Sequence, residues 1–225
     1  MRSLSIFWGT QATSPVVKSV YRAALKDYTK TFGNSLILEQ VHGTAGYVVD
    51  QDLAANWPAN VPKGDYLITQ VPKLSIGVLT ADCLPIIFFD AKQKVAAIAH
   101  AGWRGTVAGI AKVVYNQLNQ NFNVKPEDLQ IFLGPSAKSC CYEVDLKFVT
   151  SLQHDKIATQ CFLETAQRYF FDVSKYNMLC LQAYGVPVNN INLKNNICTI
   201  CHNDYCSYRK YGDQTGLQLS LVTLY

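Results

Sequence analysis

The sequence predicts a domain of the α/β or α+β class, with strands and helices intermixed along the chain. Short apolar runs rich in Val and Ile, bounded by Pro, Gly, Asp or Lys, are typical of buried strands. Other segments repeat their apolar residues at a helical period. The chain has 225 residues, of which 49% are hydrophobic, so it can bury one substantial core. No linker or internal repeat divides it, and we expect residues 1–225 to form a single catalytic domain.

The predicted elements follow one another along the chain. The predicted strands cover 35–41, 74–83, 84–90, 94–101, 129–135 and 216–225. After the fourth strand the period changes, and one face of an amphipathic helix is formed by Val107, Ile110, Ala111, Val114 and Leu118. A second helix is predicted over 172–186, with Gly185 as the residue that stops it.

Charge and composition exclude several classes of partner. Lys and Arg total 20 and Asp and Glu total 16, which gives a net charge of +4. The basic residues are scattered, so we expect no nucleic-acid partner, whereas a mildly positive field favours an anionic small substrate. No apolar run is long enough for a membrane span or for the core of a signal peptide, and we expect a cytoplasmic monomer or weak dimer without a membrane partner. The eight cysteines are interpreted as buried thiols or metal ligands.

Two histidines and one cysteine end predicted strands. His42 and His100 each lie beside a glycine, in "VHG" and "AHAG", and Cys83 closes "TADC". If these strand ends meet, imidazole and thiolate supply the ligands that Zn²⁺ prefers, and three protein ligands leave the fourth position for water or substrate. From spacing alone, two core histidines and a buried thiol are an equally good interpretation.

Arg104 lies where a predicted strand turns into a helix. The first N–H groups of a helix attract anions, and Gly102 and Gly105 would let a ligand approach the backbone closely. The guanidinium adds a planar fork for phosphate or carboxylate. The alternative is that Arg104 pairs with a structural carboxylate, Asp82 or Asp90.

The late segment "CTICHNDYC" contains Cys198, Cys201, His202 and Cys206. We interpret these cysteines as buried thiols, because four ligands within so few residues leave little chain for a tetrahedral cage; a second, structural zinc is the alternative. His154 is predicted to lie on a polar helix surface. Arg209, in "SYRKYGDQTG", either lines a site or is solvated.

Several stretches together resemble one family. They are "LEQVHG" (38–43), "TADCLPIIFFD" (80–90), "AHAGWRGTVAGI" (99–110), "GPSAKSCCYEV" (134–144) and "CSYRKYGDQTG" (206–216). From about residue 36 onward the chain resembles the laccase-domain family, also called YfiH-like or multicopper polyphenol oxidase-like. The resemblance implies a single α/β domain with mixed sheets sandwiched between helices (α/β/β/α). It also implies a zinc ion held by His42, Cys83 and His100. Family members are similar to purine nucleoside phosphorylases that split adenosine, inosine and methylthioadenosine with phosphate, with adenosine deamination as a side activity.

The remaining site residues follow from the motifs and the resemblance together. Catalysis is assigned to Arg104 and Asp82, with Asp82 either a base or ligand partner beside Cys83, or a structural carboxylate. Contacts to nucleoside and phosphate are assigned to Gln40, Gly102, Arg104, Gly105 and Arg209. Two departures from the family pattern bear on phosphate affinity. Gln11 stands where the family has an Arg followed by a glycine pair, and Leu217 stands in the Arg position of "TGRQ".

Other mechanisms remain alternatives to phosphorolysis. A zinc-bound water could deaminate adenosine or cleave an amide in a peptidoglycan precursor. A blue-copper centre would need a weak axial ligand such as Met, and Met1 and Met178 lie away from these motifs, so copper is disfavoured. Cys83 could instead be the nucleophile of a metal-free cysteine hydrolase. A partner-binding relative without activity is the non-enzymatic alternative.

Overall fold

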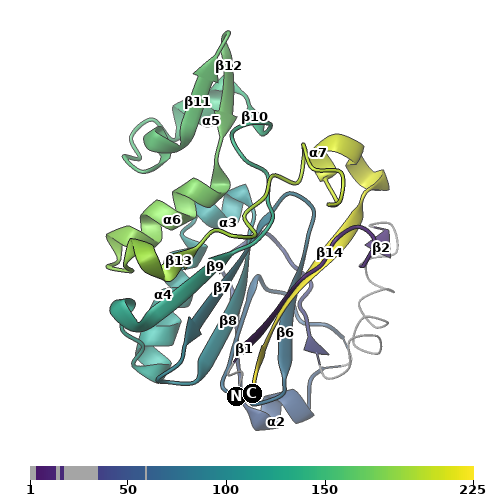
Figure 1. Ribbon diagram of the computed structural model, residues 1–225, viewed down its shortest axis with the longest axis vertical. Coiled ribbons are helices and arrows are strands. Elements are labelled where there is room, and N and C mark those ends of the chain that lie inside the picture. The colour runs from purple at the N-terminus through teal and green to yellow at the C-terminus, as the bar shows by residue number, and fades with distance from the viewer. Residues whose placement is uncertain (1–3, 14–15, 18–34, 59) are drawn as a thin grey trace.

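The computed structural model describes residues 4–13, 16–17, 35–58 and 60–225. Its largest sheet has six strands in the order β13-β9-β7-β8-β5-β4 (Figure 1). These strands are β4 (Gly46–Val49), β5 (Tyr66–Thr69), β7 (Leu84–Asp90), β8 (Val95–Ala101), β9 (Leu129–Leu133) and β13 (Ile191–Asn192). The β7–β8 and β7–β9 pairs are antiparallel, and β7 and β8 are buried along their whole length.

A second, five-stranded sheet packs against the first, and a small third sheet projects from one end of the molecule (Figure 1). The second sheet contains β1 (Leu4–Trp8), β2 (Val16–Val17), β3 (Ser35–Leu36), β6 (Ser75–Thr80) and β14 (Gly216–Leu224). The third contains β10 (Glu143–Val144), β11 (Phe162–Thr165) and β12 (Arg168–Phe171).

Helices cover the outer face of the six-stranded sheet (Figure 1). The α-helices are α2 (Gln51–Ala55), α3 (Trp103–Val107), α4 (Ile110–Phe122), α5 (Leu146–Ser151), α6 (Val173–Ala183) and α7 (Tyr208–Tyr211). Single 3₁₀ turns cover Pro126–Asp128, Ala158–Cys161, Val188–Asn190 and Gly212–Gln214. Among the described residues, no helix is long and apolar enough to cross a bilayer.

The hydrophobic core is divided between the two faces of the six-stranded sheet. Alternate residues of β7 point to opposite sides, as the period of a strand requires. Phe88 packs with the apolar face of α4, and Ile87 packs between the two sheets with Ile76 and Val222. Burial on both faces explains why β7 and β8 are nearly continuous apolar runs instead of alternating ones.

The predicted α/β class, with sheets packed face to face under helices, is confirmed. The described residues form the two sheets and the helical layer over the larger one. The strand predicted over 35–41 is too long, because only Ser35–Leu36 pairs in the sheet and the chain then turns toward His42. The single helix predicted after His100 is two helices, since Gly109 adopts a φ of +85° between α3 and α4. Helix α6 ends next to Gly185, as predicted.

Strand register brings the chemically interesting residues together. In the β7–β8 pair Leu84 lies opposite Ala101, so Cys83, one residue before β7, lies beside the end of β8. In the β5–β8 pair Tyr66 lies opposite Ala99, which sets Asp65 beside His100. Backbone pairing in the sheet therefore already places Asp65, Cys83 and His100 close together.

Replacing Phe88 by Ala tests the core under α4. The ring is fully buried, so its loss should lower the free energy of unfolding by about 3–5 kcal/mol, from lost transfer energy plus a cavity. The matched control is Leu163→Ala in β11, where 49% of the side chain is exposed and a loss below about 1 kcal/mol is expected. Urea unfolding of both variants measures the difference; equal losses would contradict the assignment of the core.

Candidate metal centre and its pocket

One pocket collects most of the residues that the sequence singled out. Its volume is about 630 Å³, within the range of sites for small molecules. Its lining residues are Glu39, Gln40, His42, Leu79, Ala81, Asp82, Cys83, His100, Trp103, Arg104, Ala137, Tyr142, Val173, Tyr208, Arg209, Thr215 and Leu217. They come from both large sheets and from the loops between their strands, so the pocket depends on the packing of the whole domain.

His42, Cys83 and His100 converge in this pocket. One potential ligand atom from each residue lies within 4.8 Å of the other two. The rings of His42 and His100 meet edge to face, with centroids 4.8 Å apart. His42 is exposed, Cys83 is half-buried and His100 is buried, so the cluster opens toward the pocket. Two imidazoles and a thiolate could hold a metal ion and leave one tetrahedral position open. The structure brings the three predicted ligands together, and their role as ligands remains a prediction.

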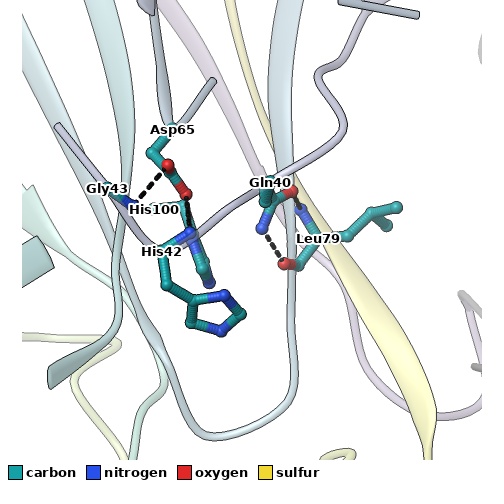
Figure 2. Close-up of polar contacts among 6 residues, drawn as sticks. All are labelled: Gln40, His42, Gly43, Asp65, Leu79 and His100. Atoms are coloured by element: carbon teal, nitrogen blue, oxygen red, sulfur yellow. Dashed lines mark hydrogen bonds and ion pairs between the residues drawn. The ribbon is translucent and has the colours of Figure 1, made fainter. Parts of the chain in front are cut away.

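A buried carboxylate holds the His100 ring and the backbone of the His42 loop in position (Figure 2). Asp65 accepts a hydrogen bond from His100 Nδ1 at 2.9 Å and from the backbone N–H groups of His42 at 2.9 Å and Gly43 at 2.7 Å. Because Nδ1 of His100 is directed at Asp65, its Nε2 is left to coordinate a metal. The bond to its N–H also fixes His42 at a φ of +61°, a strained conformation for a residue with a side chain.

Charges in the cluster favour the ligand form of the cysteine. Burial would raise the pKa of the Cys83 thiol, but the charge of His100 and hydrogen bonds from both imidazoles lower it to about 6. Burial would lower the pKa of His100, yet the thiolate and Asp65 raise it to about 9. Burial also opposes ionisation of Asp65, and the hydrogen bonds from His100 and Gly43 keep its pKa below the usual value. These shifts favour the thiolate form of Cys83, which is the form that a metal binds.

The glycines around Arg104 are needed for packing of the cluster, and their predicted contact with phosphate or substrate remains a prediction. A Cβ on Gly102 would lie 2.9 Å from His42 Cδ2 and 3.0 Å from Cys83 Sγ. A Cβ on Gly105 would lie 2.8 Å from the carbonyl oxygen of Gly43. Both glycines therefore let α3 pack closely against the ligand loop.

Arg104 is exposed on the pocket wall, with its guanidinium 4.4 Å from the centre of the Trp103 ring. No carboxylate in the described residues forms an ion pair with it, so the predicted alternative partners, Asp82 and Asp90, are not used. Helix α3 has only five residues, so few peptide dipoles add up at its start, and the expected anion cradle at this terminus remains a prediction.

Asp82 is a structural carboxylate, one of the two roles that the sequence left open. One oxygen accepts a hydrogen bond from Thr199 Oγ1 at 2.6 Å. The other accepts from Ser207 Oγ at 3.1 Å and from the backbone N–H of Arg209 at 2.6 Å. These three donors give Asp82 an observed role in positioning Arg209, and its assignment to catalysis remains a prediction.

Arg209 lines the pocket from the opposite loop. Its Nη1 donates to the carbonyl oxygen of Glu143 at 2.6 Å, and its guanidinium lies 4.7 Å from the centre of the Tyr142 ring. It is exposed, so the remaining N–H groups of the fork are open to a ligand. Among the residues that the structure describes, Arg104 and Arg209 are the arginines that line this pocket.

Gln40 lines the pocket, yet its amide is bound to the protein. Its Nε2 donates to the carbonyl oxygen of Leu79 at 2.6 Å, and its Oε1 accepts the N–H of Leu79 at 2.8 Å (Figure 2). This pair connects the ligand loop to the end of β6. A contact from Gln40 to substrate remains a prediction, and its observed role is to position the loop.

The two residues that differ from the family pattern, Gln11 and Leu217, lie in different environments. Leu217 lines the pocket, so an apolar side chain stands there in place of the family's cation. Gln11 lies in an exposed turn and its N–H donates to the carbonyl oxygen of Asp204 at 2.8 Å. The end of the segment 8–15, at 14–15, lies outside the described residues.

The structure does not bring Cys198, Cys201, His202 and Cys206 together as one group of possible metal ligands. Cys198 and Cys201 cluster with Cys140 and Cys141, whereas Cys206 is buried and donates its N–H to Gln218. His202 is exposed, with Nδ1 3.6 Å from a carboxylate oxygen of Asp204. Cys201 is exposed, so its interpretation as a buried thiol is wrong. His154 is exposed as expected, but it lies in a turn after α5 and not on a helix.

Two residues of the site escaped the sequence analysis. Asp65 lies in "KGDY", directly before β5, and only the β5–β8 register reveals its contact with His100. Tyr142 follows two cysteines in "CCYEV" and lines the pocket. Burial, more than the opposing charge of Arg209, raises the pKa of Tyr142 to about 12, so its phenol stays protonated at neutral pH. The available signal for Asp65 was its position directly before the short apolar run of β5, a strand that the sequence analysis did not predict.

Comparison with known proteins adds three findings. A family model described as multi-copper polyphenol oxidoreductase laccase matches residues 9–225. A purine nucleoside phosphorylase of Clostridium acetobutylicum is 33% identical over 162 residues, which cover 71% of this chain and 66% of that protein. Adenosine deaminase RL5, from an unknown prokaryotic organism, is 31% identical over 185 residues, which cover 79% of this chain and 70% of that protein. The alignment with the Clostridium protein thus spans slightly less than two thirds of that relative's length.

A solved structure shares the fold. The crystal structure of the Bacillus licheniformis hypothetical protein YfiH matches with a TM-score of 0.84 and 23% sequence identity, covering 99% of this chain and 93% of that chain. Such a match over nearly both chains confirms the arrangement of sheets and helices.

Replacing Asp65 by Asn tests whether this carboxylate organises a metal centre. An amide cannot accept all three hydrogen bonds, because its NH₂ group would face another donor. We expect the folded variant to bind Zn²⁺, used as the probe, about 10- to 100-fold more weakly in a chelator competition.

The matched control is Asp50→Asn, which alters a carboxylate that caps α2 through the N–H of Leu53. Its Zn²⁺ affinity should equal that of the unaltered protein. A folded Asp65→Asn protein with unchanged Zn²⁺ affinity would contradict the assignment.

Proposed function

The chain belongs to the multi-copper polyphenol oxidoreductase laccase family, and on this premise we propose that it is a zinc-dependent purine nucleoside phosphorylase. The proposed substrates are adenosine, inosine and methylthioadenosine, each cleaved with phosphate. The proposal is supported by the 33% identity to a relative named purine nucleoside phosphorylase. The observation that carries it is a pocket with a metal-ligating cluster and two arginines in its wall.

The two arginines are suited to hold phosphate. Arg104 has no ion-pair partner among the described carboxylates and is stacked on Trp103, which limits the motion of its guanidinium. Arg209 is fixed by Glu143 and by the Asp82 carboxylate that binds its N–H, and the rest of its fork is open. Arginine forks bind phosphate oxygens in pairs. Arg104 and Arg209 would supply the positive charge that Leu217, at the family's Arg position, does not.

The rest of the wall suits a nucleoside. Leu79, Trp103, Val173 and Leu217 provide apolar surface for a purine, and a volume of about 630 Å³ is large enough for a nucleoside next to phosphate. The protonated phenol of Tyr142 is a hydrogen-bond donor inside this apolar wall. It would donate to the base or to a sugar hydroxyl and so orient the glycosidic bond.

The proposed reaction exchanges one bond for another. An oxygen of phosphate forms a bond to C1′ of the sugar as the bond from C1′ to the purine nitrogen breaks. The bonding electrons leave with the purine, which takes up a proton, and the products are free base and sugar 1-phosphate. Arg104 and Arg209 would hold the attacking phosphate against C1′, so that the reactants meet in an oriented pair.

The donor set of the cluster fits zinc better than copper chemistry. Two imidazoles and one thiolate are ligands that Zn²⁺ prefers, and when bound this ion supplies Lewis-acid polarisation of an oxygen ligand at the open position. The chain has four histidines, and His154 and His202 are exposed away from the cluster, so the imidazoles that several copper sites would need are missing.

Hydrolytic deamination of adenosine is the second candidate. It is favoured by the 31% identity to a relative named adenosine deaminase and by a cluster that offers three ligands and not four. In this reaction water replaces the amino group at C6 of the purine, and inosine and ammonia are the products. The same pocket would accept the nucleoside without needing the two arginines.

An assay of nucleoside cleavage tests the proposal. Purified protein should release free base from inosine and adenosine only when phosphate is present, together with one sugar 1-phosphate for each base. Arg104→Ala should raise KM for phosphate about 10- to 150-fold, since hydrogen bonds to charged groups contribute about 1.5–3 kcal/mol. Chromatography of the bases and an enzymatic ammonia assay measure both candidate reactions.

The matched control is Arg168→Ala, because Arg168 pairs with Glu143 at the surface and does not line the pocket. Its KM for phosphate should be unchanged. Ammonia without free base would favour deamination and reject phosphorolysis, and no product from either reaction would reject both.

A further inference from the structure

Four cysteines form a second cluster of metal-ligating side chains outside the pocket. Cys140 and Cys141 lie in the turn after β9, and Cys198 and Cys201 lie on a turn after β13. The four sulfur atoms all lie within 4.8 Å of one another, and those of Cys140 and Cys201 are 3.9 Å apart. No disulfide joins any of them.

We propose that Cys140, Cys141, Cys198 and Cys201 bind a structural zinc ion. In a tetrahedral site with Zn–S bonds of about 2.3 Å, neighbouring sulfurs are about 3.8 Å apart. The 3.9 Å separation of Cys140 and Cys201 is close to this value. Four thiolates fill every tetrahedral position, so this site is closed, in contrast to the three-ligand cluster of the pocket.

The backbone around the cluster is already arranged for metal binding. Ser136 and Cys198 form a parallel bridge, in which Ser136 donates to the carbonyl of Ile197 at 3.0 Å and Thr199 donates to the carbonyl of Ser136 at 3.1 Å. This bridge aligns the two turns so that each contributes a pair of sulfurs. Lys138 adds a side-chain contact between them, with Nζ 2.9 Å from Oδ1 of Asn196.

Hydrogen bonds also converge on one of the sulfurs. Cys198 is buried, and although burial opposes ionisation, the backbone N–H groups of Cys201, Ile200 and Lys138 keep the pKa of its thiol below the usual value. Donors directed at a sulfur stabilise a thiolate there. The turn 198–201 has the C-x-x-C spacing common in zinc sites, although the other pair, Cys140 and Cys141, is adjacent in the chain.

The zinc would join two loops that form one wall of the pocket. The turn with Cys140 and Cys141 continues into Tyr142, which lines the pocket. The turn with Cys198 and Cys201 contains Thr199, whose hydroxyl holds Asp82. Because these loops are far apart in sequence, a cross-link between them removes considerable freedom from the chain. The second ion would therefore order the wall without touching substrate.

Metal content tests the proposal directly. Protein purified under reducing conditions should contain two zinc ions per chain, one for each cluster. The Cys140→Ser/Cys201→Ser variant should keep one zinc, as should Cys83→Ala, while the triple variant should keep none. The matched control is Cys180→Ser, a half-buried cysteine in α6 outside both clusters, which should keep two. With Co²⁺ as a probe, Cys83→Ala should show strong thiolate-to-cobalt absorption that the triple variant lacks.

A second measurement needs no variant and so does not depend on folding of the double mutant. Cys140 and Cys201 are exposed, so a thiol-alkylating reagent should modify them in chelator-treated protein and spare them in zinc-loaded protein. Peptide mass spectrometry identifies the modified sites. Equal modification in both states would overturn the proposal, as would a single zinc that Cys83→Ala removes completely. A disulfide among these four cysteines in protein purified under reducing conditions would also overturn it.

Discussion

The carboxylate of Asp65 is the constraint on which the candidate metal centre depends. It is fully buried, and it joins a histidine of one strand to the backbone of a separate loop through three hydrogen bonds. An ionised carboxylate is costly to bury without such donors, so its burial and the geometry of the cluster require each other. The same contact chooses which ring nitrogen of His100 faces Cys83 and holds His42 in its strained backbone conformation.

A second buried carboxylate, Asp82, positions another part of the pocket wall in a similar way. Asp82 has a φ of +79° directly before Cys83, and its oxygens collect donors from Thr199, Ser207 and the backbone of Arg209. The pocket is therefore fixed by two anions that are consumed in positioning, which leaves the arginines to supply the charge for an anionic reactant.

Much of this could be predicted from the sequence, because its signals are local. Apolar runs of strand length predicted β7, β8 and β9 closely, and strand-end histidines predicted the convergence of His42 and His100 with Cys83. Signals that depend on pairing between distant segments were not available. Asp65 needs the β5–β8 register, and the cluster of Cys140 with Cys201 needs a bridge between two turns. The packing of Gly102 and Gly105 against the His42 loop also needs the fold, because that loop is distant in sequence.

The central claim is that the cluster held by Asp65 is a metal centre on which phosphorolysis depends. Its most direct test is to remove metal with a chelator and follow formation of sugar 1-phosphate from inosine and phosphate, before and after Zn²⁺ is returned. We predict that the metal-free protein forms none and that stoichiometric Zn²⁺ restores the rate. Undiminished formation of sugar 1-phosphate by protein shown to be metal-free would contradict the claim.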